Sequence, residues 1–193
     1  MVYDGIVIGV IVGFIRAGWR NSLTALSQIR LKGGLIFPIL LGIQLLLYLL
    51  HGEISFIDQY NGYMFMVVYA AGLCVIWLNR QEKGMWWIFA GVALNFVVML
   101  LNGGKMPVSL DAVAILDPDS VEALRSGIIV SKHVLLTDST LMPFLGDIIP
   151  LTLPYPRSLV ISIGDVIMNF GIFFYLQQAM LVHKLRTSFV DTK

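Results

Sequence analysis

Two aspartates, Asp147 and Asp165, are the residues of this sequence whose type and surroundings best suit chemistry. Asp165 lies between Ser162 and Asn169 in a long apolar run. In a helix these three residues would share one face, because they stand at positions i, i+3 and i+7. An ionisable group at the middle of a bilayer costs ~2.5–3.5 kcal/mol, so its presence in an apolar run indicates a functional site.

A second polar motif, Asn102-Gly103-Gly104-Lys105, follows directly after another apolar run. We predict that Asn102 and Lys105 meet the two aspartates in one site. A structural interpretation competes with this one: Asp165 would form an ion pair with Lys105, Lys132 or Arg157, and the two glycines would end a helix. We favour the structural interpretation, because structural ion pairs also gather charged residues at membrane interfaces.

The chemistry that two neighbouring aspartates support is hydrolysis. Two carboxylates that lie close together cannot both ionise cheaply, so one of them keeps its proton. The ionised carboxylate would activate water, and the protonated one would polarise the scissile carbonyl. Lys105, or the backbone amides of Gly103 and Gly104, would stabilise the charged intermediate.

The amino-acid composition indicates the environment in which such a site would lie. Of the 193 residues 58% are hydrophobic and 13% are charged, and the net charge is +1. An ordinary soluble domain has about 25% charged residues. The composition therefore excludes a soluble globular enzyme, a disordered chain and a nucleic-acid partner, and it predicts a small protein embedded in a lipid bilayer.

Five apolar stretches are candidate membrane spans. Each should be helical, because hydrocarbon offers no partner for an unpaired backbone group. The sequence predicts a single all-α domain, a polytopic membrane helix bundle with spans at about 2–17, 35–50, 63–78, 85–101 and 159–182. The segment 102–158 would form a long structured outer loop between the last two spans, with one short helix at 117–127.

The distribution of basic residues sets the expected orientation. Nine Lys and Arg residues fall on one set of alternate sides of the predicted spans and four on the other. By the positive-inside rule the N-terminus should lie outside and the C-terminus in the cytoplasm. The segment 17–32 is too polar to span; it fits either a short interfacial helix or a solvated linker.

Small residues and ligand-type residues predict packing rather than further chemistry. Gly5, Gly9 and Gly13 form a stripe that lets another helix approach closely, so a membrane-protein partner could dock there. Cys74 is the only cysteine, and the three histidines fall on different sides of the predicted membrane. We therefore predict no metal site and no cofactor.

The motifs also resemble known families. Asn102–Ser109, Leu145–Pro150 and Ser162–Asp165 together resemble an uncharacterised family of small bacterial integral-membrane proteins, known as a domain of unknown function. That resemblance covers nearly the whole chain. It implies a protein of the bacterial inner membrane, and it implies no activity.

The last quarter of the chain is similar to the end of lipoprotein signal peptidase. Gly146–Ile149 and Ser162–Gly171 correspond to the segments that carry that family's two catalytic aspartates. The resemblance implies catalytic roles for Asp147 and Asp165. The chain departs from that family in having five predicted spans instead of four.

Three classes of function stay open. The favoured class is an integral membrane protein with a polar site at the outer ends of spans four and five that acts as a structural or partner-binding component. The second is an intramembrane aspartate-dyad hydrolase acting on a peptide or lipid at the outer leaflet. The third is a carrier of a small solute, lipid or ion, whose polar path would use Asn95, Asn102, Lys105, Asp165 and Asn169 and continue past Gln177.

Overall fold

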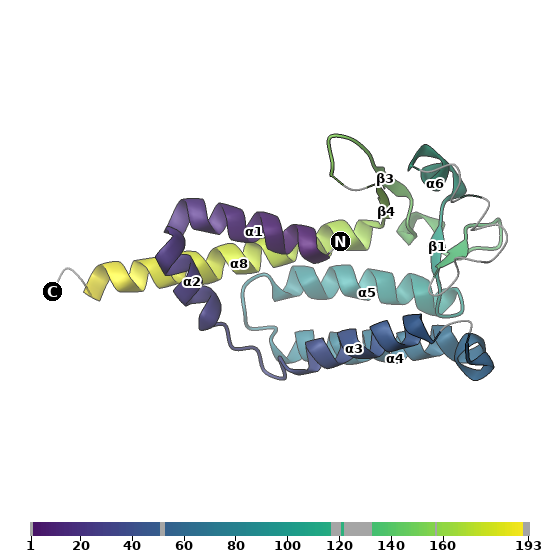
Figure 1. Ribbon diagram of the computed structural model, residues 1–193, viewed down its shortest axis with the longest axis horizontal. Helices are drawn as coiled ribbons and strands as arrows, with labels where there is room; N and C mark the ends of the chain where they lie inside the picture. Colours follow the sequence, from purple (N-terminus) through teal and green to yellow (C-terminus); the bar gives the residue numbers. More distant parts are fainter. Residues whose placement is uncertain (1, 51–52, 117–120, 122–132, 157, 191–193) are drawn as a thin grey trace.

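The computed structural model describes residues 2–50, 53–116, 121, 133–156 and 158–190 (Figure 1). This part of the chain is mostly helical. Its α-helices are α1 (Val2–Ala17), α2 (Trp19–Ser27), α3 (Ile36–Leu49), α4 (Ser55–Leu78), α5 (Met85–Leu101), α6 (Leu110–Leu116) and α8 (Ile163–Val190). The shorter elements are the strands β1 (Met106–Val108), β2 (His133–Leu135), β3 (Ile149–Leu151) and β4 (Leu159–Ile161), and the 3-10 helix η1 (Pro143–Leu145).

The long helices lie side by side along one axis, and α8 packs against both α1 and α5. The strands and α6 lie at one end of the bundle, and the N-terminus lies beside the first turns of α8 (Figure 1). The C-terminus and α2 lie at the other end. The chain therefore alternates in direction from each long helix to the next, apart from the turn made by α2.

Glycines allow the closest helix contacts. A Cβ atom at Gly91 of α5 would meet the backbone of Gly164 and Met168 in α8, so these helices touch through their main chains. The stripe of Gly5, Gly9 and Gly13 faces Asn169, Leu176 and Met180, which are all residues of α8. The stripe thus packs inside the chain, and a protein partner at the same stripe stays a prediction.

By length and composition, one helix of the described residues qualifies as a membrane span, α4 over Gln59–Leu78. The apolar helices Ile36–Leu47 and Met85–Leu101 are shorter. The helical fold is confirmed, while the arrangement as five membrane spans stays a prediction.

The structure corrects the predicted all-α fold at the segment after α5. β1 pairs with β2 in parallel, and β3 pairs with β4 in antiparallel orientation. These strands contain β-branched residues, which suit a pleated surface. Two of these strands contain a proline, Pro107 in β1 and Pro150 in β3, and each proline removes one N–H donor from a strand of three residues.

The structure also moves two predicted span boundaries. The fifth span was expected to be helical from Leu159, but Leu159–Ile161 form β4 and the helix begins at Ile163. The strand forms because its backbone finds partners in β3, which the apolar pattern alone does not reveal. Helix α4 begins at Ser55 rather than at residue 63. The segment 17–32 contains the helix α2, and most of the short helix expected at 117–127 lies outside the described residues.

Candidate functional site

Asp165 belongs to a capping box at the start of α8. The backbone N–H of Asp165 donates to the hydroxyl oxygen of Ser162 over 3.0 Å, and the Ser162 N–H donates to Asp165 Oδ2 over 3.1 Å. This reciprocal pair satisfies two donors at the helix N-terminus. Sequence analysis places Ser162 within the helix, although a Ser followed three residues later by an acid before an apolar run is a signal for this cap.

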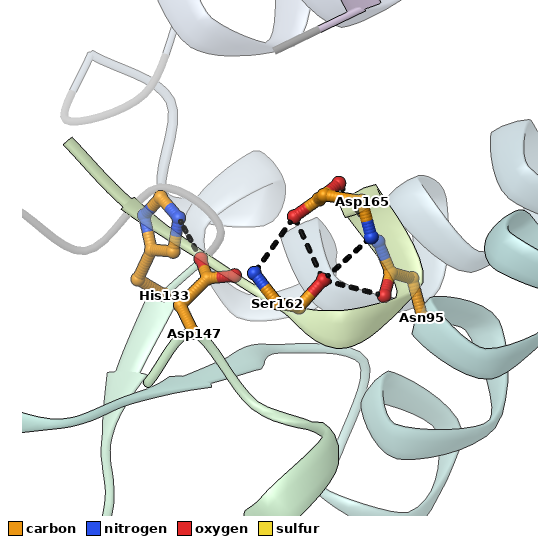
Figure 2. Close-up of polar contacts among 5 residues, drawn as sticks. All are labelled: Asn95, His133, Asp147, Ser162 and Asp165. Atoms are coloured by element: carbon orange, nitrogen blue, oxygen red, sulfur yellow. Dashed lines mark hydrogen bonds and ion pairs between the residues drawn. The ribbon is translucent and has the colours of Figure 1, made fainter. Parts of the chain in front are cut away.

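Asn95 of α5 connects the capping box to the neighbouring helix. Its Nδ2 donates to Asp165 Oδ1 over 3.1 Å (Figure 2). The Ser162 hydroxyl lies 2.9 Å from Asn95 Oδ1 and 2.7 Å from Asp165 Oδ2. The side chains of Asn95, Ser162 and Asp165 thus form a closed ring of three contacts, which we call the polar ring. All three residues are buried.

The hydrogens of the polar ring can be counted. Three contacts need three hydrogens, and the Ser162 hydroxyl and the Asn95 amide supply one each. Exchanging the positions of the Asn95 amide oxygen and nitrogen changes which contact lacks a hydrogen, but one contact still lacks a hydrogen. The ring is complete when the Asp165 carboxyl carries the third hydrogen.

Asp147 is fixed by backbone pairing with β1. Its N–H donates to the Pro107 carbonyl over 2.8 Å, and its own carbonyl accepts the Ser109 N–H over 3.0 Å. The Asp147 side chain is buried, and its Oδ2 lies 3.5 Å from Nε2 of His133 on β2. The His133 side chain is 30% exposed, so the pair is open to the surroundings on the histidine side.

Sequence analysis leaves His133 out of the site, because only the pairing of β1 with β2 brings it beside Asp147. Its position 14 residues before Asp147 gives no local signal. Among the residues that the structure describes, no group of three or more His, Cys, Asp or Glu side chains is arranged to hold a metal ion.

The two aspartates lie on adjoining segments. The Ile148 N–H donates to the Ile161 carbonyl over 3.2 Å, so the residues next to Asp147 and Ser162 are directly bonded. Figure 2 shows Asp147 on one side of Ser162 and Asp165 on the other. The polar ring and the His133–Asp147 pair therefore belong to one end of the bundle.

The side chain of Asn102 bonds backbone groups in two segments. Its amide donates to the Val98 carbonyl over 2.7 Å and to the Leu141 carbonyl over 2.9 Å. Its side-chain oxygen accepts the Leu141 N–H over 3.0 Å. Asn102 thus clamps the end of α5 to the segment before η1, and both of its polar atoms are occupied there.

Gly103 and Gly104 form the end of α5. Both have positive φ, +69° and +81°, and the Gly104 N–H donates to the Met99 carbonyl over 2.7 Å. This is the helix cap of the structural interpretation. Gly104 also lies against the backbone of Gly62 in α4. Among the described residues, the Lys105 side chain forms no ion pair or hydrogen bond, so the expected pair with Asp165 is not found.

Asn169 and Gln177 fasten α8 to α1. Asn169 accepts the Gly5 N–H over 2.9 Å and donates to the Asp165 carbonyl over 2.8 Å. Gln177 donates to the Gly9 carbonyl over 2.6 Å and accepts from Arg16 over 3.2 Å. These two side chains serve helix packing, so they lend no support to a polar path for a carrier.

Comparison with known proteins gives a family and no activity. Residues 28–177 match the model of a family of unknown function, DUF5317. An uncharacterised protein of Thermotoga maritima is 31% identical over 153 residues, which cover 69% of this chain and 85% of that protein. The chain therefore belongs to this family of unknown function. No solved structure matches it. The expected resemblance to an uncharacterised family is confirmed, while its membrane nature and bacterial origin stay predictions.

Proposed function

We propose that this protein is a multi-pass membrane hydrolase that uses Asp147 and Asp165 at the outer end of its helix bundle. The membrane part of the proposal rests on composition and on the bundle's surface. Large apolar side chains on the long helices face outward, for example Ile15 at 79%, Ile39 at 59% and Val67 at 69% exposure. A soluble monomer rarely exposes so much contiguous apolar surface.

The arrangement of the bundle supports the proposed orientation. The polar segment after α5 lies at one end and the C-terminus at the other, and α1 begins on the side nearer the polar segment (Figure 1). With the basic residues counted above, the end with the polar segment would face outward in a bacterial inner membrane. The aspartates would then act near the outer leaflet.

One observation carries the hydrolase: two buried carboxylates on adjoining segments stand in different surroundings. Asp165 is held by Ser162 and Asn95 in the polar ring, whereas Asp147 lies beside a partly exposed histidine. Environments that separate two carboxyl groups in this way assign an acid and a base.

The reaction follows from these roles. The Asp147 carboxylate removes a proton from a water molecule, whose oxygen attacks the substrate's carbonyl carbon. Asp165 gives its proton to the carbonyl oxygen, which stabilises the tetrahedral intermediate. When the intermediate breaks down, the proton held by Asp147 passes to the leaving group and Asp165 recovers its own proton. Ser162 and Asn95 hold Asp165 in position throughout.

The test uses the full chain in lipid vesicles of its host membrane composition. The similarity to lipoprotein signal peptidase favours a membrane-anchored lipoprotein precursor as first substrate, and total membrane peptides and lipids serve as a second pool. In ¹⁸O-water, hydrolysis puts the label into the new carboxyl group. Asp147→Asn and Asp165→Asn should each lower the rate by about a hundredfold or more. Asp138→Asn removes an exposed acid from the same segment and should leave the rate unchanged.

A structural component is the second candidate, and a specific observation favours it. Both carboxylate oxygens of Asp165 are used in joining the start of α8 to Asn95 of α5. In this case no ¹⁸O-labelled product forms from either pool, and variants at Asp165 change stability alone. A labelled product that persists in both asparagine variants would also exclude the aspartate pair.

A further inference from the structure

A second polar site lies at the other end of the bundle, in a pocket of about 430 Å³. Three segments line the pocket: the end of α2, the connection between α4 and α5, and the middle of α8. A cavity of this size can hold a small molecule or a lipid headgroup. Its polar lining consists mainly of Gln28, Arg30, Gln81, Glu82, Lys83 and Gln178.

This pocket is separate from the aspartates. Helices α5 and α8 run antiparallel, with Asn95 beside Asp165 and Gly84 beside Tyr175, a residue that lines the pocket. The 11 residues from Gly84 to Asn95 correspond to about 16 Å along a helix. A ligand in the pocket would therefore not touch the polar ring.

The lining of the pocket has the composition of an anion site. Arg30 and Lys83 bring two positive charges against one negative charge on Glu82. Within the part of the chain that the structure describes, the side chains of Arg30 and Lys83 form no ion pair or hydrogen bond. Their donors are therefore available to a ligand. An arginine presents a planar fork that matches a phosphate group, and a lysine adds a point charge.

We propose that this pocket binds a phosphate-bearing anion through Arg30 and Lys83. Gln28, Gln81 and Gln178 supply neutral amide donors around the same anion. The phosphate can come from an anionic phospholipid headgroup or from a free solute. Basic pockets on the cytoplasmic side of helix bundles are suited to such headgroups. The proposal does not depend on the hydrolase.

Glu82 provides a test in which a substitution should strengthen anion binding. Its carboxylate lines the same pocket and repels an anion there, so Glu82→Gln should tighten binding severalfold. Arg30→Gln and Lys83→Gln should each weaken binding about tenfold, since each removes one charge-assisted contact. Ala179→Leu fills the pocket without changing the charge and should also weaken binding.

The matched control is Lys32→Gln. Lys32 is exposed, lies two residues after Arg30 and is not part of the pocket lining. Lys32→Gln removes one positive charge from the connection between α2 and α3, as Arg30→Gln does, and should leave binding unchanged. If Lys32→Gln weakens binding as much as Arg30→Gln, the effect comes from the general surface charge and the pocket proposal is overturned.

The binding experiment uses the purified full chain in a nonionic detergent and isothermal calorimetry. One arm titrates inorganic phosphate, and the other titrates short-chain phosphatidylglycerol against phosphatidylcholine of the same chain length. Saturable binding of phosphate supports a free solute, and selective binding of phosphatidylglycerol supports a lipid headgroup. If neither probe binds to a chain whose circular dichroism shows the native helix content, the proposal is wrong.

Discussion

Replacing Asp165 by asparagine tests the hydrogen count of the polar ring. Asparagine has nearly the shape of a protonated aspartate and brings its own N–H donors. With the Asn95 amide turned over, the new amide donates to Asn95 Oδ1, Asn95 donates to Ser162 Oγ, and the Ser162 hydroxyl donates to the new amide oxygen. Every contact of the ring then holds a hydrogen. We therefore expect Asp165→Asn to change the free energy of unfolding by less than about 1 kcal/mol.

Asp165→Ala should behave differently, because it removes the carboxyl that takes part in three hydrogen-bonded contacts. These are the contacts with the Asn95 amide, the Ser162 N–H and the Ser162 hydroxyl, at 3.1, 3.1 and 2.7 Å. A net hydrogen bond contributes about 1 kcal/mol, so the alanine variant should lose about 3 kcal/mol. Leaving the buried Asn95 donor unsatisfied can add to this loss.

The assay is equilibrium unfolding of the full chain in mixed detergent micelles, followed by far-ultraviolet circular dichroism. Asp138→Asn serves as the control, because it removes an exposed carboxylate from the segment before η1. The two Asp165 variants are compared at the same micelle composition. If Asp165→Asn destabilises the protein as strongly as Asp165→Ala, the ring requires a charged carboxylate, and both the hydrogen count and the acid role of Asp165 are refuted.

Three further predictions follow from packing, charge and topology. Gly91→Ala should destabilise the chain by about 1–3 kcal/mol in the same unfolding assay, because the new Cβ would meet the α8 backbone. Gly42 has open space around it, so the control Gly42→Ala should be neutral or stabilising. Lys105→Met should change stability by less than about 0.5 kcal/mol, and a larger loss would reveal an ion pair. In a chain without Cys74, a cysteine that replaces Ser55 should react with an impermeant thiol reagent applied to intact cells, and a cysteine that replaces Gln81 should not. The reverse result would contradict the proposed topology.

Local patterns predicted the helices well. The apolar runs 2–17 and 85–101 coincide with α1 and α5, and 35–50 differs from α3 by one residue at each end. The backbone hydrogen bonds of a helix join residues four positions apart, so the local sequence determines where a helix begins and ends. Strand β4 was missed because three residues are too few to show alternation, and their partner strand is defined only by tertiary pairing.

The contacts of the candidate site also differ in whether they join residues that are close together or far apart in the sequence. Ser162 and Asp165 are three residues apart, so their spacing marked them as neighbours, although their bonding as a helix cap was not recognised. Asn95 joins Asp165 across 70 positions, and His133 reaches Asp147 only through the β1–β2 pairing. Contacts of this kind depend on how the helices and strands assemble, which a single sequence does not specify.

The polar side chains of α8 differ in what they bond, and this difference bears on function. Asn169 and Gln177 bond the backbone of α1, so they take part in helix packing. Asp165 bonds the Ser162 N–H and also two side chains, those of Ser162 and Asn95, and an amide at this position can complete the same ring. The whole ring lies within residues 28–177, which match the family, whereas helix α1, to which Asn169 and Gln177 bond, lies entirely before that range. In the proposed hydrolase, the comparison of Asp165→Asn with Asp165→Ala therefore tests whether this position needs an ionisable group or only a group that completes the ring.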